Sequence, residues 1–160
     1  MGIKALFTEH THFLFNTTQG ILLNKMCKWY LKECDATIAV SHACRDNFVL
    51  RAKISPHTCF TIPNAVDTNK FTPNPSLRYP KHTINIVMIQ RLSDRKGCDM
   101  LVDLIPDVLN AVPNAYFIIG GDGDKRPLLD QLVQKFNLQN SVELLGAVPH
   151  DKVKDVLNRG

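Results

Sequence analysis

The chain has 160 residues, of which 44% are hydrophobic, and its formal net charge is +4. This length supports an ordinary hydrophobic core, and the absence of a basic run with interleaved aromatic residues argues against a nucleic-acid-binding protein. Five cysteines, with no Cys-x-x-Cys pair and no neighbouring histidine cluster, argue against a disulfide framework or a structural zinc site. No apolar run approaches the roughly 20 residues that a membrane-spanning helix needs.

The first third of the sequence predicts strands that alternate with helices. The expected elements are strands over residues 3–8, 37–40 and 59–62, a helix over residues 19–34, and a second helix after Ser41. Ser41 is expected to cap that second helix, which holds Phe48 and Val49. Trp29 in the first helix is expected in the core or in an interface, since a large aromatic side chain usually serves one of these.

Residues 63–83 change in character and form the best domain boundary. Four prolines and several Asn and Ser residues make this stretch polar and extended. Asn64, Asp67 and Phe71 are expected to be structural, since Asn and Asp shape turns and Phe71 buries an aromatic ring at the hinge. The predicted division is a first domain over 1–72, a linker over 73–83, and a second domain over 84–160.

The second domain shows strict alternation of strand and helix. The predicted elements are strands over 84–90, 115–120 and 141–145, and helices over 97–110, 125–136 and 149–158. This order predicts an α/β fold with parallel, Rossmann-like sheets. The run that begins at Ile84 is apolar without alternation, which is typical of a parallel strand covered on both faces.

Two cations follow that strand. Arg91 and Lys96 lie on the turn before a predicted helix, next to Gly97, at the sheet edge where α/β folds bind ligands. Two cations beside a glycine favour a diphosphate, although solvated surface charges are the plain alternative.

Glycines follow the next strand. Gly120, Gly121 and Gly123 are expected near the Arg91–Lys96 turn, because consecutive parallel strands emerge at the same edge of a sheet. Glycine there leaves room for a ligand, and equally serves a tight turn. Asp122 and Asp124 resemble a D-x-D metal motif, but we interpret them as turn residues. The spacing of the glycines also fails the dinucleotide fingerprint, because the third glycine is missing.

Together these motifs resemble retaining GT-B glycosyltransferases of the GT4 family. The agreement extends in order and spacing over nearly the whole chain, through FTEH (7–10), VLRAKISP (49–56), IPNAVDTNKFTP (62–73), RLSDRKGCDML (91–101), FIIGGDGDKR (117–126) and VELLGAVPHDKVKDVL (142–157). Among GT4 members, the chain most resembles those that start glycosylphosphatidylinositol-anchor synthesis. The resemblance implies transfer of N-acetylglucosamine from UDP-GlcNAc to phosphatidylinositol at the cytosolic face of the endoplasmic reticulum membrane, within a multi-subunit complex.

The resemblance also implies roles for individual residues. Arg91 and Lys96 would hold the donor diphosphate and stabilise the leaving nucleotide, so that no metal or other cofactor is expected. His10, in a Thr-Glu-His setting similar to the family's Thr-Asp-His, would contact the donor sugar, with His12 as the alternative. Further donor-binding positions are implied at Gly97, Gly120, Gly121, Gly123 and Leu145.

A complete GT-B enzyme has two full Rossmann-like domains. By that comparison we expect an internal fragment, which holds the end of the acceptor-side domain and the first half of the donor domain. The family's downstream pair of acidic residues is absent, so the fragment is expected to be inactive alone. Two alternatives stay open: another GT4 enzyme with a different sugar or acceptor, and a non-catalytic remnant that binds a partner protein of the complex.

Overall fold

The computed structural model describes residues 3–10, 18–78 and 84–160. It divides the chain into two compact units, one up to Val66 and one from Asp67 to Gly160. The first boundary predicted from the sequence is residue 72 instead, and part of the predicted linker, residues 79–83, lies outside the described residues. No helix in the described ranges combines the length and the hydrophobicity that crossing a membrane requires.

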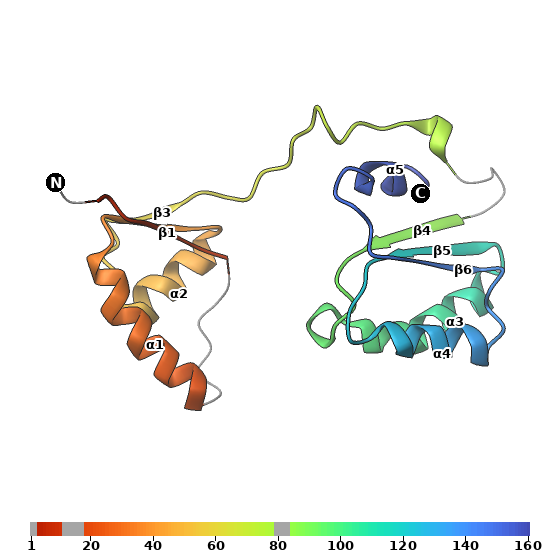
Figure 1. The fold of residues 1–160 in the computed structure, drawn as a ribbon, viewed down its shortest axis with the longest axis horizontal. Coiled ribbons are helices and arrows are strands. Elements are labelled where there is room, and N and C mark those ends of the chain that lie inside the picture. Colours follow the sequence, from red (N-terminus) through yellow and green to blue (C-terminus); the bar gives the residue numbers. More distant parts are fainter. Residues whose placement is uncertain (1–2, 11–17, 79–83) are drawn as a thin grey trace. The chain divides into compact units, whose positions relative to one another are not determined.

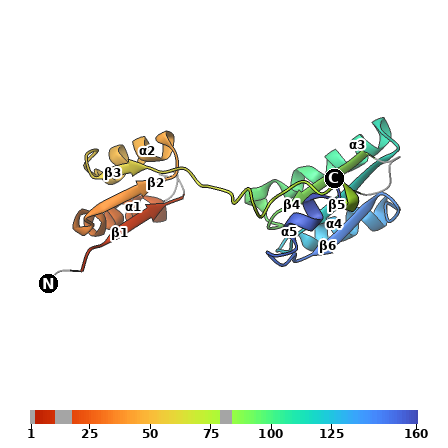
Figure 2. The same ribbon diagram turned by 90° about the horizontal axis from the view of Figure 1, so that it is seen from above.

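The first unit is a parallel three-stranded sheet with both helices on one side (Figure 1). Its elements are β1 (Leu6–Glu9), α1 (Thr18–Tyr30), β2 (Ala36–Ala39), α2 (His42–Ala52) and β3 (Cys59–Thr61), with a 3-10 turn over Leu31–Glu33. Strand β2 pairs with β1 and β3 and lies between them (Figure 2). The predicted cap is confirmed, because the Ser41 hydroxyl accepts a hydrogen bond from the Cys44 amide at 3.1 Å.

Of the two places expected for Trp29 of helix α1, the structure excludes the core and leaves an interface. Trp29 is 71% exposed, so it does not belong to the core of this unit. That core forms around Phe48 and Ala52 of α2 instead, together with Leu31 and Cys59.

The second unit is also a parallel sheet, in the order β4-β5-β6. Its elements are β4 (Ile84–Ile89), α3 (Leu101–Ala111), β5 (Ala115–Gly120), α4 (Arg126–Lys135), β6 (Val142–Gly146) and α5 (Val153–Leu157). Helices α3 and α4 cover one face of the sheet and α5 lies on the other (Figure 1). The parallel α/β fold class and all six predicted elements are therefore confirmed. Helix α3 begins later than predicted, because two short 3-10 turns, over residues 94–96 and 98–100, precede it.

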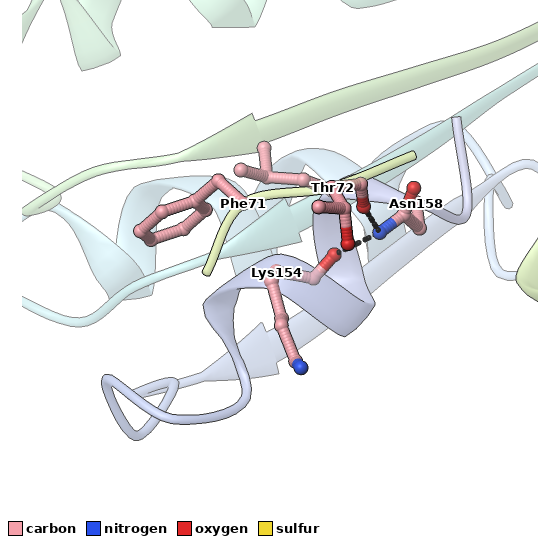
Figure 3. Close-up of a pocket in the computed structure, with 5 residues that line it drawn as sticks. Phe71, Thr72, Lys154 and Asn158 are labelled. Carbon is pink, nitrogen blue, oxygen red and sulfur yellow. Dashed lines mark hydrogen bonds between the residues drawn. The ribbon is translucent and has the colours of Figure 1, made fainter. Parts of the chain in front are cut away.

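The connector packs onto α5 within this unit. The Asn158 side chain donates a hydrogen bond to the Thr72 carbonyl at 3.1 Å and accepts one from the Asn74 amide at 2.7 Å. Phe71 is half-buried edge-on to the His150 ring, 6.5 Å between centroids. Phe71, Thr72 and Asn158, with Lys154 and Leu157 of α5, border a small cavity of about 150 Å³ (Figure 3). The expected turn role of Asp67 is confirmed, since its carboxylate accepts the Asn69 amide at 2.9 Å.

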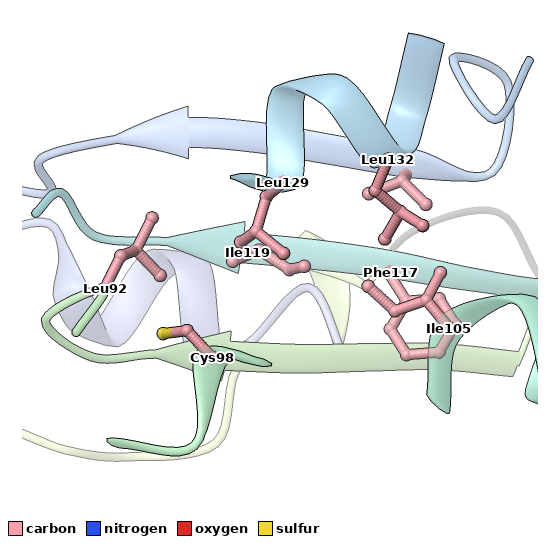
Figure 4. Packing of buried hydrophobic residues seen from close by; sticks show 8 residues of the cluster. Leu92, Cys98, Ile105, Phe117, Ile119, Leu129 and Leu132 are labelled. Carbon is pink, nitrogen blue, oxygen red and sulfur yellow. The ribbon is translucent and has the colours of Figure 1, made fainter. Parts of the chain in front are cut away.

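The core of the second unit lies between the sheet and helices α3 and α4. Phe117 and Ile119 of β5 pack against Ile105, Leu129 and Leu132 (Figure 4). Ile118, on the opposite face of β5, is also fully buried, so this central strand is covered on both faces. Strand β4 is only half-buried, and Ile84 is 53% exposed, contrary to the prediction. The reason is that β4 pairs on one side only in this sheet.

Candidate functional site

The carboxyl ends of the three strands of the second unit meet at one edge. The Gln90 amide donates to the Gly120 carbonyl at 3.0 Å, and the Gly121 amide donates to the Gly146 carbonyl at 2.7 Å. The loop after β4 then continues along the turn after β5, where the Leu92 amide donates to the Asp122 carbonyl at 3.0 Å. The structure thus brings the Arg91 loop and the glycine turn together, as the parallel topology predicts.

The Arg91 loop carries a concentration of positive charge. Arg91 and Lys96 are exposed, and with Ser93 and Arg95 they line a hollow of about 330 Å³. The Gln90 side chain donates to the Lys96 carbonyl at 3.1 Å and so closes the loop. Three cations and a hydroxyl around one hollow suit an anion such as a phosphate. Sequence reasoning passed over Arg95, although its position next to Lys96 was the available signal.

Lys125, which directly precedes α4, forms ion pairs with two carboxylates that follow β4. Its ammonium lies 2.6 Å from the Asp94 carboxylate and 3.1 Å from the Asp99 carboxylate. Hydrogen bonds to Asp94 and Asp99 raise the pKa of Lys125, and the hydrogen bond from Lys125 lowers the pKa of Asp94. The ion pair therefore ties the cationic loop to the turn after β5. Its single charge also compensates one of the two carboxylate charges that offset the positive charge of the hollow.

The glycine turn is shaped by packing against the Arg91 loop. A Cβ atom on Gly121, at φ +133°, would lie 1.7 Å from the Gln90 carbonyl oxygen. A Cβ atom on Gly123 would lie 2.2 Å from the Leu92 carbonyl oxygen. The space that these glycines leave is thus taken by the chain itself, and the donor-binding roles of Gly120, Gly121 and Gly123 stay predictions.

Asp122 has a hydrogen-bond partner within this turn. The Asp122 carboxylate accepts the Gly123 amide at 2.8 Å, which is turn chemistry, as interpreted from the sequence. Within the described ranges, no group of three or more His, Cys, Asp or Glu side chains is placed to hold a metal ion.

Helix α4 places a further cation beside β6, and this residue was not among the predicted site residues. Arg126, the first residue of α4, pairs with Asp130 at 3.0 Å and donates to the Leu144 carbonyl at 3.4 Å. Leu144 packs against the core, as expected. Leu145 is half-buried, and its place near a nucleotide base stays a prediction.

His10 belongs to the first unit, directly after β1, and is exposed. Arg91 and Lys96 belong to the second unit. A role for His10 beside the donor sugar therefore stays a prediction. His12 lies outside the described residues.

Family models and known proteins match both parts of the chain. The model of the family described as Glycosyltransferase Family 4 matches residues 1–70, and that described as Glycosyl transferases group 1 matches residues 72–159. Two relatives are each named as a subunit of phosphatidylinositol N-acetylglucosaminyltransferase, one from Arabidopsis thaliana (46% identical) and one from Homo sapiens (40% identical). Each match covers 100% of this chain but only 36% and 33% of the relative, so the chain spans about a third of their length.

A solved structure shows the same fold. Alr3699/HepE from Anabaena, in complex with UDP and glucose, superposes with a TM-score of 0.75 at 20% identity. The match covers 98% of this chain and 44% of that protein. The fold is therefore the predicted GT-B type of parallel Rossmann-like sheets, represented here in part.

Proposed function

The chain belongs to the Glycosyl transferases group 1 family, and on that premise we propose that the protein transfers N-acetylglucosamine from UDP-GlcNAc to phosphatidylinositol. The names of relatives that match this chain from end to end support the reaction. The observation that carries the proposal is the cationic hollow of Arg91, Arg95 and Lys96 at the carboxyl edge of the sheet. A hollow of this charge suits the diphosphate that every UDP-sugar contains.

Arg91 and Lys96 act on the leaving group in this proposal. When the bond from the sugar to the diphosphate breaks, negative charge accumulates on UDP, and fixed cations lower the energy of that transition state. The Lys125 ion pairs hold the loop before the donor arrives, so that little reorganisation is needed during the reaction. Protein cations then take the place of a divalent ion, and no metal is required.

The first unit would supply the acceptor side. We propose that His10 contacts the donor sugar, so that its contribution appears in turnover and not in the binding of UDP, which lacks the sugar. The proposal also includes partner proteins of a multi-subunit complex and a location at the cytosolic face of the endoplasmic reticulum membrane. The relatives' names support the complex, since each relative is itself called one of its subunits.

Titration of the chain with UDP, UMP and uridine tests the donor site. A charge-assisted hydrogen bond contributes about 1.5–3 kcal/mol, so UDP is expected to bind best and uridine worst. Arg91→Ala is expected to weaken UDP binding by roughly 10- to 100-fold and to leave uridine binding unchanged. A chelator is expected to have no effect on UDP affinity.

Arg78→Ala provides the matched control, because Arg78 is an exposed arginine of the same unit that precedes β4 instead of following it. This variant is expected to bind UDP like the unmodified chain. Equal affinity for UDP and uridine would refute the diphosphate site. Equal affinity for UDP and GDP would retain that site but point to a transferase for another nucleotide sugar.

A further inference from the structure

Most of the connector between the two units belongs to the second unit by its contacts. The hydrogen bonds of the first unit end where the Ile62 amide donates to the Ala39 carbonyl at 3.0 Å. Those of the second unit begin at Asp67, whose carbonyl accepts from the Phe71 amide at 3.0 Å. Between these two points, residues 63–66 are all exposed and form no backbone hydrogen bond with a described residue.

Residues 67–77 of the connector, which we call the strap, lie on helix α5 (Figure 1). Asn158, the residue that follows α5, holds the middle of the strap. Its side-chain amide donates to the Thr72 carbonyl and accepts from the Asn74 amide, so it pairs with the backbone on both sides of Pro73. A neighbouring β-strand would pair with a residue in the same way. Pro73 has no N–H, and its ring fixes φ, so the backbone at the contact is already set.

The Asn158 side chain is also anchored to its own helix. Its amide nitrogen donates to the Lys154 carbonyl of α5 at 2.9 Å as well as to the Thr72 carbonyl (Figure 3). An asparagine side chain has two N–H donors and one acceptor oxygen, and each kind of group is used here. Because the bond to Lys154 orients the amide group, the side chain is preorganised to receive the strap.

The two halves of the strap have contacts of their own. In the first half, the Lys70 ammonium lies 5.9 Å from the centre of the Phe71 ring, which packs beside α5. In the second half, the Asn74 side chain accepts a hydrogen bond from the Ser76 amide at 3.2 Å and so caps the short 3-10 turn Pro75–Leu77. The strap is therefore a folded part of the second unit, although its composition is that of a linker.

We propose that the two units move relative to one another about residues 63–66, and that Asn158 is the positioning residue that keeps the strap out of this movement. A hinge consists of a few residues between folded elements that absorb the change in φ and ψ. Residues 63–66 fit this description, since hydrogen-bonded structure ends before them and begins after them. Release of the strap would lengthen the hinge to residues 63–77. A longer hinge allows more relative orientations, so each particular orientation costs more chain entropy.

Amide hydrogen exchange of the full chain tests both ends of the hinge. The amides of residues 64–66 are expected to exchange at nearly the rate of an unfolded chain, because they have no backbone acceptor among the described residues. The Phe71 and Asn74 amides, which donate within the second unit, are expected to exchange at least roughly tenfold more slowly. Equal protection of the two segments would overturn the inference.

Asn158→Ala removes the side chain that holds the strap and leaves the strap's own sequence unchanged. Exchange of the Asn74 amide is expected to become roughly tenfold faster, on the scale of the hydrogen bonds lost. Exchange of the Ile118 amide, in the fully buried centre of β5, is expected to be unchanged. The matched control is Asn110→Ala, which changes an exposed asparagine of α3, on the other face of the sheet (Figure 1). Unchanged exchange at Asn74, or equal acceleration at Ile118, would overturn the role of Asn158.

Nuclear magnetic resonance relaxation of the backbone nitrogens locates the hinge directly. In the unmodified chain, the strap is expected to share the rotational correlation time of the second unit, with fast internal motion confined to residues 63–66. In Asn158→Ala this motion is expected to extend to residue 77, and in Asn110→Ala it is expected to stay at residues 63–66. Rigid residues 63–66, or a strap that tumbles with the first unit, would overturn the inference. These measurements need no nucleotide, so their outcome is independent of the donor site.

Discussion

Replacement of Gly121 by Ala is expected to disable the cationic hollow without touching a charge. The new Cβ atom would lie 1.7 Å from the Gln90 carbonyl oxygen, and ordinary contact begins near 3.4 Å. The Gln90 carbonyl would therefore have to retreat by about 1.7 Å. Arg91 is the next residue along the chain, so the retreat moves the guanidinium away from the position that it holds in the loop.

The expected cost has two parts. Overpacking against backbone costs about 1–3 kcal/mol, and alanine at the positive φ of Gly121 adds about 1–3 kcal/mol of backbone strain. Gly97→Ala in the same region is the matched control. Gly97 also has a positive φ, of +71°, but its Cβ atom would meet only the Met100 sulfur at 3.6 Å. The control thus carries backbone strain alone, about 1–2 kcal/mol.

Urea unfolding and UDP titration together measure both effects. Gly121→Ala is expected to lower the free energy of unfolding by more than Gly97→Ala does, and to lose UDP affinity to the extent that Arg91→Ala does. A Gly121→Ala variant that binds UDP as tightly as the unmodified chain would refute the argument. It would show that the Gln90–Leu92 backbone yields without displacing Arg91.

Three further predictions concern the two units. Leu129→Ala removes most of a fully buried side chain. In urea unfolding, this variant is expected to lower the free energy of unfolding of the second unit by about 2–5 kcal/mol. A change within about 0.5 kcal/mol would exclude Leu129 from the core. Since the pKa of Asp94 is lowered in the fold, the stability from its pairing with Lys125 is present above the unfolded Asp pKa of about 3.9 and is lost as pH falls below it. Thermal unfolding across pH 2–6 is expected to show this loss, and Asp94→Asn should flatten it; an unchanged profile would contradict the ion pair. His10→Ala is expected to lower the turnover of the proposed transfer by roughly 10²–10³-fold while UDP affinity is unchanged, and full activity would make His10 structural.

The parts of the fold that follow local rules could be predicted from the sequence. The alternation of strand and helix, the cap at Ser41 and the turn at Asp67 each depend on residues within a few positions of one another. The meeting of the Arg91 loop with Gly120 and Gly121 followed from topology, because parallel strands end at one edge.

The remaining features depend on contacts that no local pattern encodes. The runs at Ile84 and Phe117 are alike in hydrophobicity, yet the central strand β5 is almost fully buried and the edge strand β4 is only half-buried. The pairing of Lys125 with Asp94 and Asp99 joins the segment after β4 to the segment after β5 and has no signal in spacing. Helix α1 contradicts the usual amphipathic rule, since Asn24 is buried and Trp29 is exposed.

The order of the second sheet has a consequence for how this unit folds. Its strands pair in the order in which they occur in the chain, and paired residues are only 31 and 25 positions apart, as in Ile84 with Ala115 and Phe117 with Val142. Each pairing therefore closes a short loop, which costs little chain entropy and favours fast folding. Because a ribosome delivers β4 before β5 and β5 before β6, the sheet grows by one strand at a time in the direction of synthesis.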